Sequence, residues 1–251
     1  MTTEPRHLLV IGAQRCGTTY LRSLLEAHPD VAMARPARPE PKVFLSSERA
    51  DRGLAWYRET YFAHATRERL WGEKSTSYLE HGEAATRAAA MLGPAQIIAL
   101  LRDPVARAVS NWRFSRTHGV EDRPLAQAMR ENLDGPRSWD PAQTSVSPYA
   151  YLERGRYADD LRPWWAAFPD TTQVVFLAEL AGSASAVAGL YASLGLDPDA
   201  RPSGIERPVN TSEGPAPDLD PALVGRLRDY FRESDARLRE RLGRELPWPV
   251  D

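Results

Sequence analysis

Short apolar runs alternate with amphipathic segments along this chain. The runs occupy residues 8–12, 97–101 and 173–177, with a shorter one near 71–74. Continuous apolar runs of this length are typical of strands buried on both faces of a parallel sheet. Apolar spacing of three or four, or alanine-rich composition, predicts helices in the segments 18–27, 55–62, 83–91, 105–117, 125–133, 149–165 and 220–242.

This order of strands and helices predicts an α/β fold with a central, mostly parallel sheet flanked by helices. The 251 residues, 42% hydrophobic and 26% charged, are enough for one substantial core, so we predict a single domain over residues 1–251. We expect no membrane span and no signal peptide, because the apolar stretch after residues 1–6 is too short for either.

Charge and cysteine content narrow the possible partners. A net charge of −2 argues against nucleic acid or another polyanion, since such partners favour a clear basic excess. The single cysteine, Cys16, excludes an internal disulfide and fits a reducing compartment. We therefore expect a cytoplasmic protein without a nucleic-acid partner, whose oligomeric state the composition does not reveal.

The loop after the first apolar run has the chemistry of an anion site. It has the sequence GAQRCGTT, in which Gly12 and Gly17 allow a tight turn that points backbone amides of the following helix at an anion. The spacing matches the phosphate loop of nucleoside triphosphatases, except that Thr18 takes the place of the lysine that reaches the β- and γ-phosphates. The cation is instead Arg15, so we expect an anion other than ATP. An ordinary strand-to-helix turn is the alternative.

With three further segments, this loop makes the chain resemble the sulfotransferases that use 3′-phosphoadenosine 5′-phosphosulfate, in particular the heparan-type branch. In that family the loop carries Lys or Arg just before a small residue and Gly-Thr-Thr, and it holds the 5′-phosphosulfate of the donor. The resemblance implies a P-loop-like core, no metal, and a donor-binding set of Gln14, Arg15, Cys16, Gly17, Thr18 and Thr19. Arg15 would also neutralise charge that develops on the leaving phosphate.

The second segment, residues 97–112, resembles the family's 3′-phosphate site, with Arg102 and Ser110 as ligands. A planar guanidinium at a strand end can bind a phosphate through two parallel hydrogen bonds, and a hydroxyl two helical turns later adds a donor. The alternative is that Arg102 pairs on the surface with Asp103 or Glu73.

The third segment, residues 38–45, resembles a Lys-Glu-Pro-x-Phe-Phe stretch whose glutamate is the general base, which implies that role for Glu40. A base is needed because an alcohol is a poor nucleophile until its proton is removed. Prolines on both sides of Glu40 restrict the backbone, although Pro39 stands where the family has lysine. A solvated acid in a proline-rich loop is the alternative.

The fourth segment, residues 71–79, resembles the Gly-Glu-Lys-Ser/Thr-Pro-Ser-Tyr strand whose lysine faces the acceptor pocket. Lys74 would place positive charge on the sulfonyl oxygens or orient the acceptor. Thr76 replaces the family's proline. The alternative is that Lys74 is a surface residue paired with Glu73.

These segments imply transfer of a sulfonate group to a hydroxyl or amine of a small-molecule, sugar or glycolipid acceptor by a bacterial enzyme, with release of adenosine 3′,5′-bisphosphate. In the phenol- and steroid-type branch the base is a histidine, for which we retain His118 as a candidate. A small-molecule kinase or a non-catalytic nucleotide-binding protein are alternative functions. The Gly, Pro and Ser-rich stretch at residues 135–148 is either an acceptor lid or a mobile connection.

Overall fold

The computed structural model describes residues 4–140, 147–200 and 219–250. The chain forms two compact units, of which the first is built from Met1–Leu101 and Leu161–Asn210 and the second from Arg102–Asp160 and Thr211–Asp251. The extent of one domain over residues 1–251 stays a prediction. Part of the stretch 135–148, residues 141–146, lies outside the described residues, so its role as a lid also stays a prediction.

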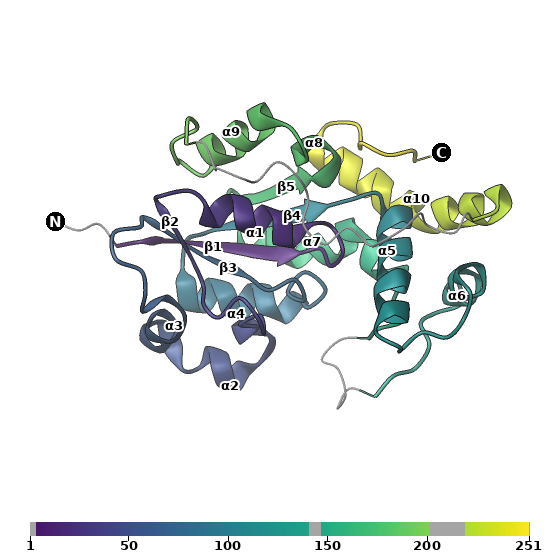
Figure 1. The fold of residues 1–251 in the computed structure, drawn as a ribbon, viewed down its shortest axis with the longest axis horizontal. Helices are drawn as coiled ribbons and strands as arrows, with labels where there is room; N and C mark the ends of the chain where they lie inside the picture. The colour runs from purple at the N-terminus through teal and green to yellow at the C-terminus, as the bar shows by residue number, and fades with distance from the viewer. Residues whose placement is uncertain (1–3, 141–146, 201–218, 251) are drawn as a thin grey trace. The chain divides into compact units, whose positions relative to one another are not determined.

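A five-stranded parallel sheet lies at the centre of the first unit (Figure 1). Its strand order is β2-β3-β1-β4-β5, and every neighbouring pair is parallel. The strands are β1 (Arg6–Gly12), β2 (Val31–Met33), β3 (Leu70–Lys74), β4 (Ala95–Leu101) and β5 (Thr172–Phe176). This sheet with its flanking helices confirms the predicted α/β fold class.

Helices cover both faces of this sheet. The helical segments of the first unit are α1 (Thr18–Glu26), the 3₁₀ turn η1 (Val43–Leu45), α2 (Ser47–Ala50), α3 (Gly53–Phe62), α4 (Gly82–Leu92), α8 (Leu177–Leu180) and α9 (Ala184–Ser193). On one face, Leu21 of α1 and Leu190 of α9 join Leu8 and Ile98 in a buried cluster. Connections between parallel strands are right-handed. Because α1 leads from β1 toward one edge of the sheet and α4 leads from β3 toward the other, the two helices lie on opposite faces.

The second unit is mainly helical. It contains α5 (Pro104–Thr117), α6 (Leu125–Asn132), the 3₁₀ turn η2 (Glu153–Gly155) and α10 (Pro221–Leu242), and it shares α7 (Tyr157–Ala167) with the first unit. The start of α5 follows from its sequence, since the carboxylate of Asp103 accepts a hydrogen bond from the amide of Val105 at 2.8 Å and Pro104 needs no amide partner in the first turn. Trp112, Met129, Tyr151, Leu227 and Phe231 belong to its buried core.

A buried histidine ties β1 to α3 in the first unit. His7 is 3% exposed, and its Nε2 accepts a hydrogen bond from Nε of Arg58 at 3.3 Å. Burial lowers the pKa of His7 from 6.5 to about 4, and the positive charge of Arg58 adds to this effect. The folded protein therefore keeps this ring neutral at pH values where the unfolded chain protonates it.

We expect the free energy of unfolding to decrease as the pH falls from about 6.5 to 4, because the unfolded chain binds the extra proton in this window. A shift of this size corresponds to about 3 kcal/mol. The variant His7→Gln, whose amide oxygen still accepts from Arg58, should lose this part of the dependence. Urea titrations of both proteins at several pH values measure the difference, and equal pH slopes would contradict the assignment to His7.

Candidate active site

The loop between β1 and α1 presents backbone amides at a helix start. Arg15 and Gly17 have φ angles of 66° and 86°, in the left-handed region. Where left-handed and right-handed residues alternate along the backbone, successive amide groups point toward the same side and can bind an anion. Gly17 is the N-cap of α1 and has no side chain to satisfy the first amides of the helix. The positive φ favours glycine here, and a Cβ atom on Gly17 would also lie 2.7 Å from Cδ1 of Leu177, so that the end of this side chain would have to shift.

The other predicted loop residues line the same turn. Nε2 of Gln14 donates to Oε1 of Glu80 at 3.0 Å. Cys16 is fully buried, in keeping with a packing role, and Thr18 is 6% exposed in the first turn of α1. Thr19 follows it in that turn and is half-buried. The structure therefore gathers the six residues of the predicted donor loop at the C-terminal end of β1.

The end of β3 lies beside this loop. In the parallel register Lys74 pairs with Val10, and the amide of Ser75 donates to the carbonyl oxygen of Val10 at 3.1 Å. In α/β sheets, ligands bind outside the carboxyl ends of the strands. Lys74 is thus brought to the edge of the sheet where the anion loop begins.

Glu40 reaches the same edge from the loop after β2. Its carboxylate forms an ion pair with Nζ of Lys74, and the two side chains are 16% and 11% exposed. Its Oε2 also accepts hydrogen bonds from the amide of Thr76 at 3.0 Å and from the hydroxyl of Thr76 at 3.1 Å. A proline at this position could supply neither bond, so the threonine of this chain adds two donors to Glu40.

Glu73 does not have the surface position that the alternative for Lys74 required. Glu73 is fully buried. Its carboxylate accepts hydrogen bonds from the hydroxyls of Tyr57, Ser75 and Tyr78 at 2.7, 2.6 and 2.6 Å. Burial raises the pKa of Glu73, and these three hydrogen bonds oppose part of the shift. The pairing of Lys74 with Glu73 was therefore wrong, because Lys74 pairs with Glu40 instead.

Arg102 and Ser110 lie in the second unit and are both half-buried. Arg102 comes just before Asp103, the N-cap of α5, and Ser110 lies within α5. Asp103 forms two hydrogen bonds with Arg228 of α10, at 2.8 and 2.7 Å. Among the described residues Asp103 thus pairs with Arg228 and not with Arg102, so that alternative is wrong. Glu73 is buried and does not offer the surface partner that the other alternative required. The role of Arg102 and Ser110 as 3′-phosphate ligands stays a prediction.

His118, the competing base, caps the C-terminal end of α5. Its Nδ1 lies 2.8 Å from the carbonyl oxygen of Phe114, and its ring lies 4.0 Å from the Phe114 ring, centroid to centroid. Both residues belong to the second unit. Within the described residues, no group of three or more His, Cys, Asp and Glu side chains could hold a metal ion.

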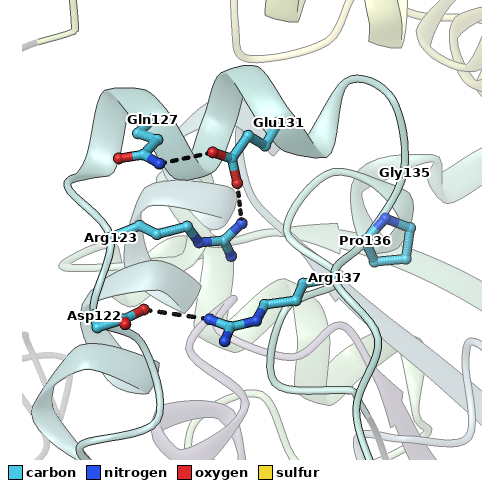
Figure 2. A pocket seen from close by; sticks show the side chains of 7 residues that line it. All are labelled: Asp122, Arg123, Gln127, Glu131, Gly135, Pro136 and Arg137. Atoms are coloured by element: carbon cyan, nitrogen blue, oxygen red, sulfur yellow. Dashed lines mark hydrogen bonds and ion pairs between the residues drawn. The ribbon is translucent and has the colours of Figure 1, made fainter.

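A cavity of about 480 Å³ lies in the second unit, and none of the predicted site residues lines it (Figure 2). It is lined by Asp122, Arg123, Gln127, Glu131, Gly135, Pro136 and Arg137. Arg123 pairs with Glu131 at 2.6 Å and Arg137 with Asp122 at 3.3 Å, as Figure 2 shows. Its charges therefore satisfy one another, and we assign it no ligand.

Residues 5–178 match the sequence model of the family described as "Sulfotransferase domain". The chain belongs to the sulfotransferase family. It is 28% identical over 263 residues to heparan sulfate glucosamine 3-O-sulfotransferase 3B1 of Mus musculus, covering 96% of this chain and 64% of that protein. It is 29% identical to heparan sulfate glucosamine 3-O-sulfotransferase 6 of Homo sapiens, covering 96% of this chain and 72% of that protein. The chain spans slightly less than two thirds of the length of the 3A1 and 3B1 enzymes that it matches.

Solved structures of sulfotransferases share the fold. The sulfotransferase from Alicyclobacillus acidocaldarius superposes with a TM-score of 0.76 at 23% identity, and the match covers 97% of this chain and 98% of that one. The sulfotransferase domain of the Synechococcus olefin synthase gives a TM-score of 0.54 at 18% identity, over 98% and 97% of the two chains. In the described part of this sulfotransferase, no helix is both long and apolar enough to cross a membrane.

Proposed function

We propose that this sulfotransferase transfers a sulfonate group from 3′-phosphoadenosine 5′-phosphosulfate to a hydroxyl or amine of an acceptor and releases adenosine 3′,5′-bisphosphate. The observation that carries the proposal is the Glu40–Lys74 ion pair at the edge of the sheet where the anion loop begins. A carboxylate, an ammonium group and a set of helix-start amides together suit removal of an alcohol proton and stabilisation of negative charge.

The anion loop fits the donor's 5′-phosphosulfate. The donor supplies a sulfonate group on a phosphate that leaves as an anion. The backbone amides at the start of α1 and the guanidinium of Arg15 would bind that phosphate, and Gly17 lets it approach the backbone closely. Arg102 and Ser110 would bind the 3′-phosphate. The pairing of Lys74 with Glu40 would hold the carboxylate where it can accept a proton.

The reaction follows from these positions. Glu40 takes the proton of the acceptor as the acceptor oxygen or nitrogen forms a bond to sulfur, and the bond between sulfur and the 5′-phosphate oxygen breaks. Lys74, freed from part of its pairing as Glu40 becomes neutral, stabilises charge on the sulfonyl oxygens. Arg15 and the amides of α1 stabilise charge on the departing phosphate. No step requires a metal.

The names of the relatives support a carbohydrate acceptor, since heparan sulfate glucosamine is the substrate that they state. The net charge of −2 favours a small or weakly charged sugar, glycolipid or other small molecule over a sulfate-rich polymer. A cytoplasmic location stays a prediction, which the single cysteine supports because it fits a reducing compartment. A bacterial source also stays a prediction.

Two measurements test the function. Calorimetry should show binding of adenosine 3′,5′-bisphosphate and no binding of ATP with Mg²⁺, and a mass-spectrometric screen with the sulfonate donor should show an acceptor that gains a sulfonate group. A small-molecule kinase would instead bind ATP with Mg²⁺ and not adenosine 3′,5′-bisphosphate. Such an enzyme also has a lysine where this chain has Thr18. Binding without transfer to any acceptor would favour a non-catalytic nucleotide-binding protein.

The variants Arg102→Ala and Ser110→Ala should weaken adenosine 3′,5′-bisphosphate binding while leaving AMP binding unchanged. Loss of a charge-assisted hydrogen bond to phosphate costs about 1.5–3 kcal/mol, so Arg102→Ala should weaken binding by about ten- to a hundredfold. Titration calorimetry with both nucleotides measures this. If the unmodified protein binds the two nucleotides equally, the 3′-phosphate is not recognised at these residues.

A further inference from the structure

Glu73 is a buried carboxyl group of β3 that the proposed reaction does not use. Its Oε1 accepts hydrogen bonds from Ser75 and Tyr78, and its Oε2 accepts one from Tyr57. A buried carboxylate is costly unless donors surround it. Burial also raises the pKa values of Tyr57 and Tyr78 well above 10, which keeps both hydroxyls protonated as donors.

The carboxylate sets the direction of two further hydrogen bonds. A hydroxyl group has a single proton to donate. Because Ser75 and Tyr78 donate theirs to Glu73, the lone pairs of their oxygens are available to backbone amides. The Ser75 oxygen accepts from the amide of Lys42 at 2.9 Å, and the Tyr78 oxygen accepts from the amide of Phe44 at 3.2 Å.

These two amides lie directly after the candidate base in the chain. Pro41 follows Glu40 and has no amide hydrogen, so Lys42 is the first residue after Glu40 whose backbone can donate a hydrogen bond. The two hydroxyls therefore hold residues 42–44 against the residues that follow β3. Those same residues include Thr76, whose amide donates to Glu40.

We propose that Glu73 is a positioning residue, which acts through Ser75 and Tyr78 to hold the segment 40–44 so that Glu40 lies beside Lys74. The role is geometric, because Glu73 and Glu40 are like charges and repel each other. Four charged groups lie next to this network. Lys74 and Glu40 form their ion pair there, and Arg49 and Arg87 donate hydrogen bonds to the carbonyl oxygens of Pro41 and Phe44 at 2.8 and 3.1 Å. The inference rests on the proposed function, in which Glu40 is the base.

The test compares Glu73→Met with Glu73→Gln. Methionine fills a similar volume without an acceptor, whereas the amide oxygen of glutamine can still accept from Ser75 and Tyr78. In Glu73→Met we expect hydrogen exchange at the amides of Lys42 and Phe44 to become about tenfold faster or more. The kcat for sulfonate transfer should fall about ten- to a hundredfold, because a small displacement of a reacting group has effects of this size. Binding of adenosine 3′,5′-bisphosphate should stay within about twofold, and Glu73→Gln should keep wild-type exchange and kcat.

Two further variants keep the test decisive. Ser75→Ala should speed exchange at the Lys42 amide and leave the Phe44 amide unchanged, and it decides the matter if Glu73→Met does not fold. Glu121→Met is the matched control, because Glu121 is a buried glutamate of the second unit that accepts a hydrogen bond from the Tyr151 hydroxyl at 2.7 Å. It should destabilise the protein without raising the Lys42 and Phe44 exchange rates above the general loss of stability.

Several results would overturn the proposal. Unchanged exchange at both amides in Glu73→Met would show that Glu73 does not hold the segment. Faster exchange at these amides in Glu73→Met, together with a wild-type kcat, would show that fixing the segment 40–44 does not affect sulfonate transfer. A loss of activity in Glu73→Gln equal to that in Glu73→Met would mean that charge, not geometry, is required. If the unmodified protein transfers no sulfonate, the proposed function fails, and the exchange rates still decide whether the network holds the segment.

Discussion

Glu40→Gln is expected to abolish most sulfonate transfer while the fold and donor binding stay intact. The amide keeps the shape of the side chain, and its oxygen can still accept from the amide of Thr76. It cannot take the acceptor's proton, and loss of a general base costs about a hundred- to ten-thousandfold in rate. Turnover with saturating donor, calorimetry with adenosine 3′,5′-bisphosphate and thermal unfolding measure the three properties.

A matched control and a competing candidate complete this test. The control is Glu48→Gln, which changes an exposed carboxylate on α2 in the same unit. It should keep the rate of the unmodified protein. Full activity in Glu40→Gln together with inactivation in His118→Ala would move the base to the histidine.

The strands and most helices could be predicted because each carries its own pattern. β1 and β4 are continuous apolar runs, and the structure extends each of the predicted ranges by two residues at its N-terminal end. β2 was missed because its three residues are too few to show a pattern, and its place is set by pairing with β3. α9 was missed because alanine and glycine on its exposed positions give little contrast with its apolar face. The helix predicted from residue 149 begins only at Tyr157.

The site could be predicted residue by residue but not as an arrangement. Glu40 and Lys74 were each found from a local motif, yet they are 34 positions apart, and the order of parallel strands brings them together. Glu73 was placed on the surface by the alternatives for Lys74 and Arg102. One signal in the sequence could have indicated its buried position. Glu73 lies inside a short strand that is expected to be buried on both faces, where a carboxyl group needs hydrogen-bond donors around it. Its partners come from α3 and from the turn after β3, which no local pattern connects.

Arg15→Ala is expected to reduce turnover about a hundredfold or more, which is the effect of removing one group that stabilises charge in the transition state. Donor affinity should fall less, because Gly17 and the amides at the start of α1 remain in place to bind the phosphate. The two effects separate because charge on the leaving phosphate develops as its bond to sulfur breaks, so the guanidinium contributes more in the transition state than in the bound donor.

Initial rates at saturating donor and calorimetry with adenosine 3′,5′-bisphosphate distinguish these effects in Arg15→Ala. The variant Arg15→Lys should recover much of the turnover, because it restores a cation at the same place in the loop. Arg69→Ala is the matched control, since it removes a largely exposed arginine whose partner is Asp30 in the same unit, and it should leave turnover unchanged. Wild-type turnover in Arg15→Ala would exclude Arg15 from the chemistry. An equal loss in donor affinity and in kcat/KM, with kcat unchanged, would limit Arg15 to binding, because an interaction made equally in the ground and transition states does not change kcat.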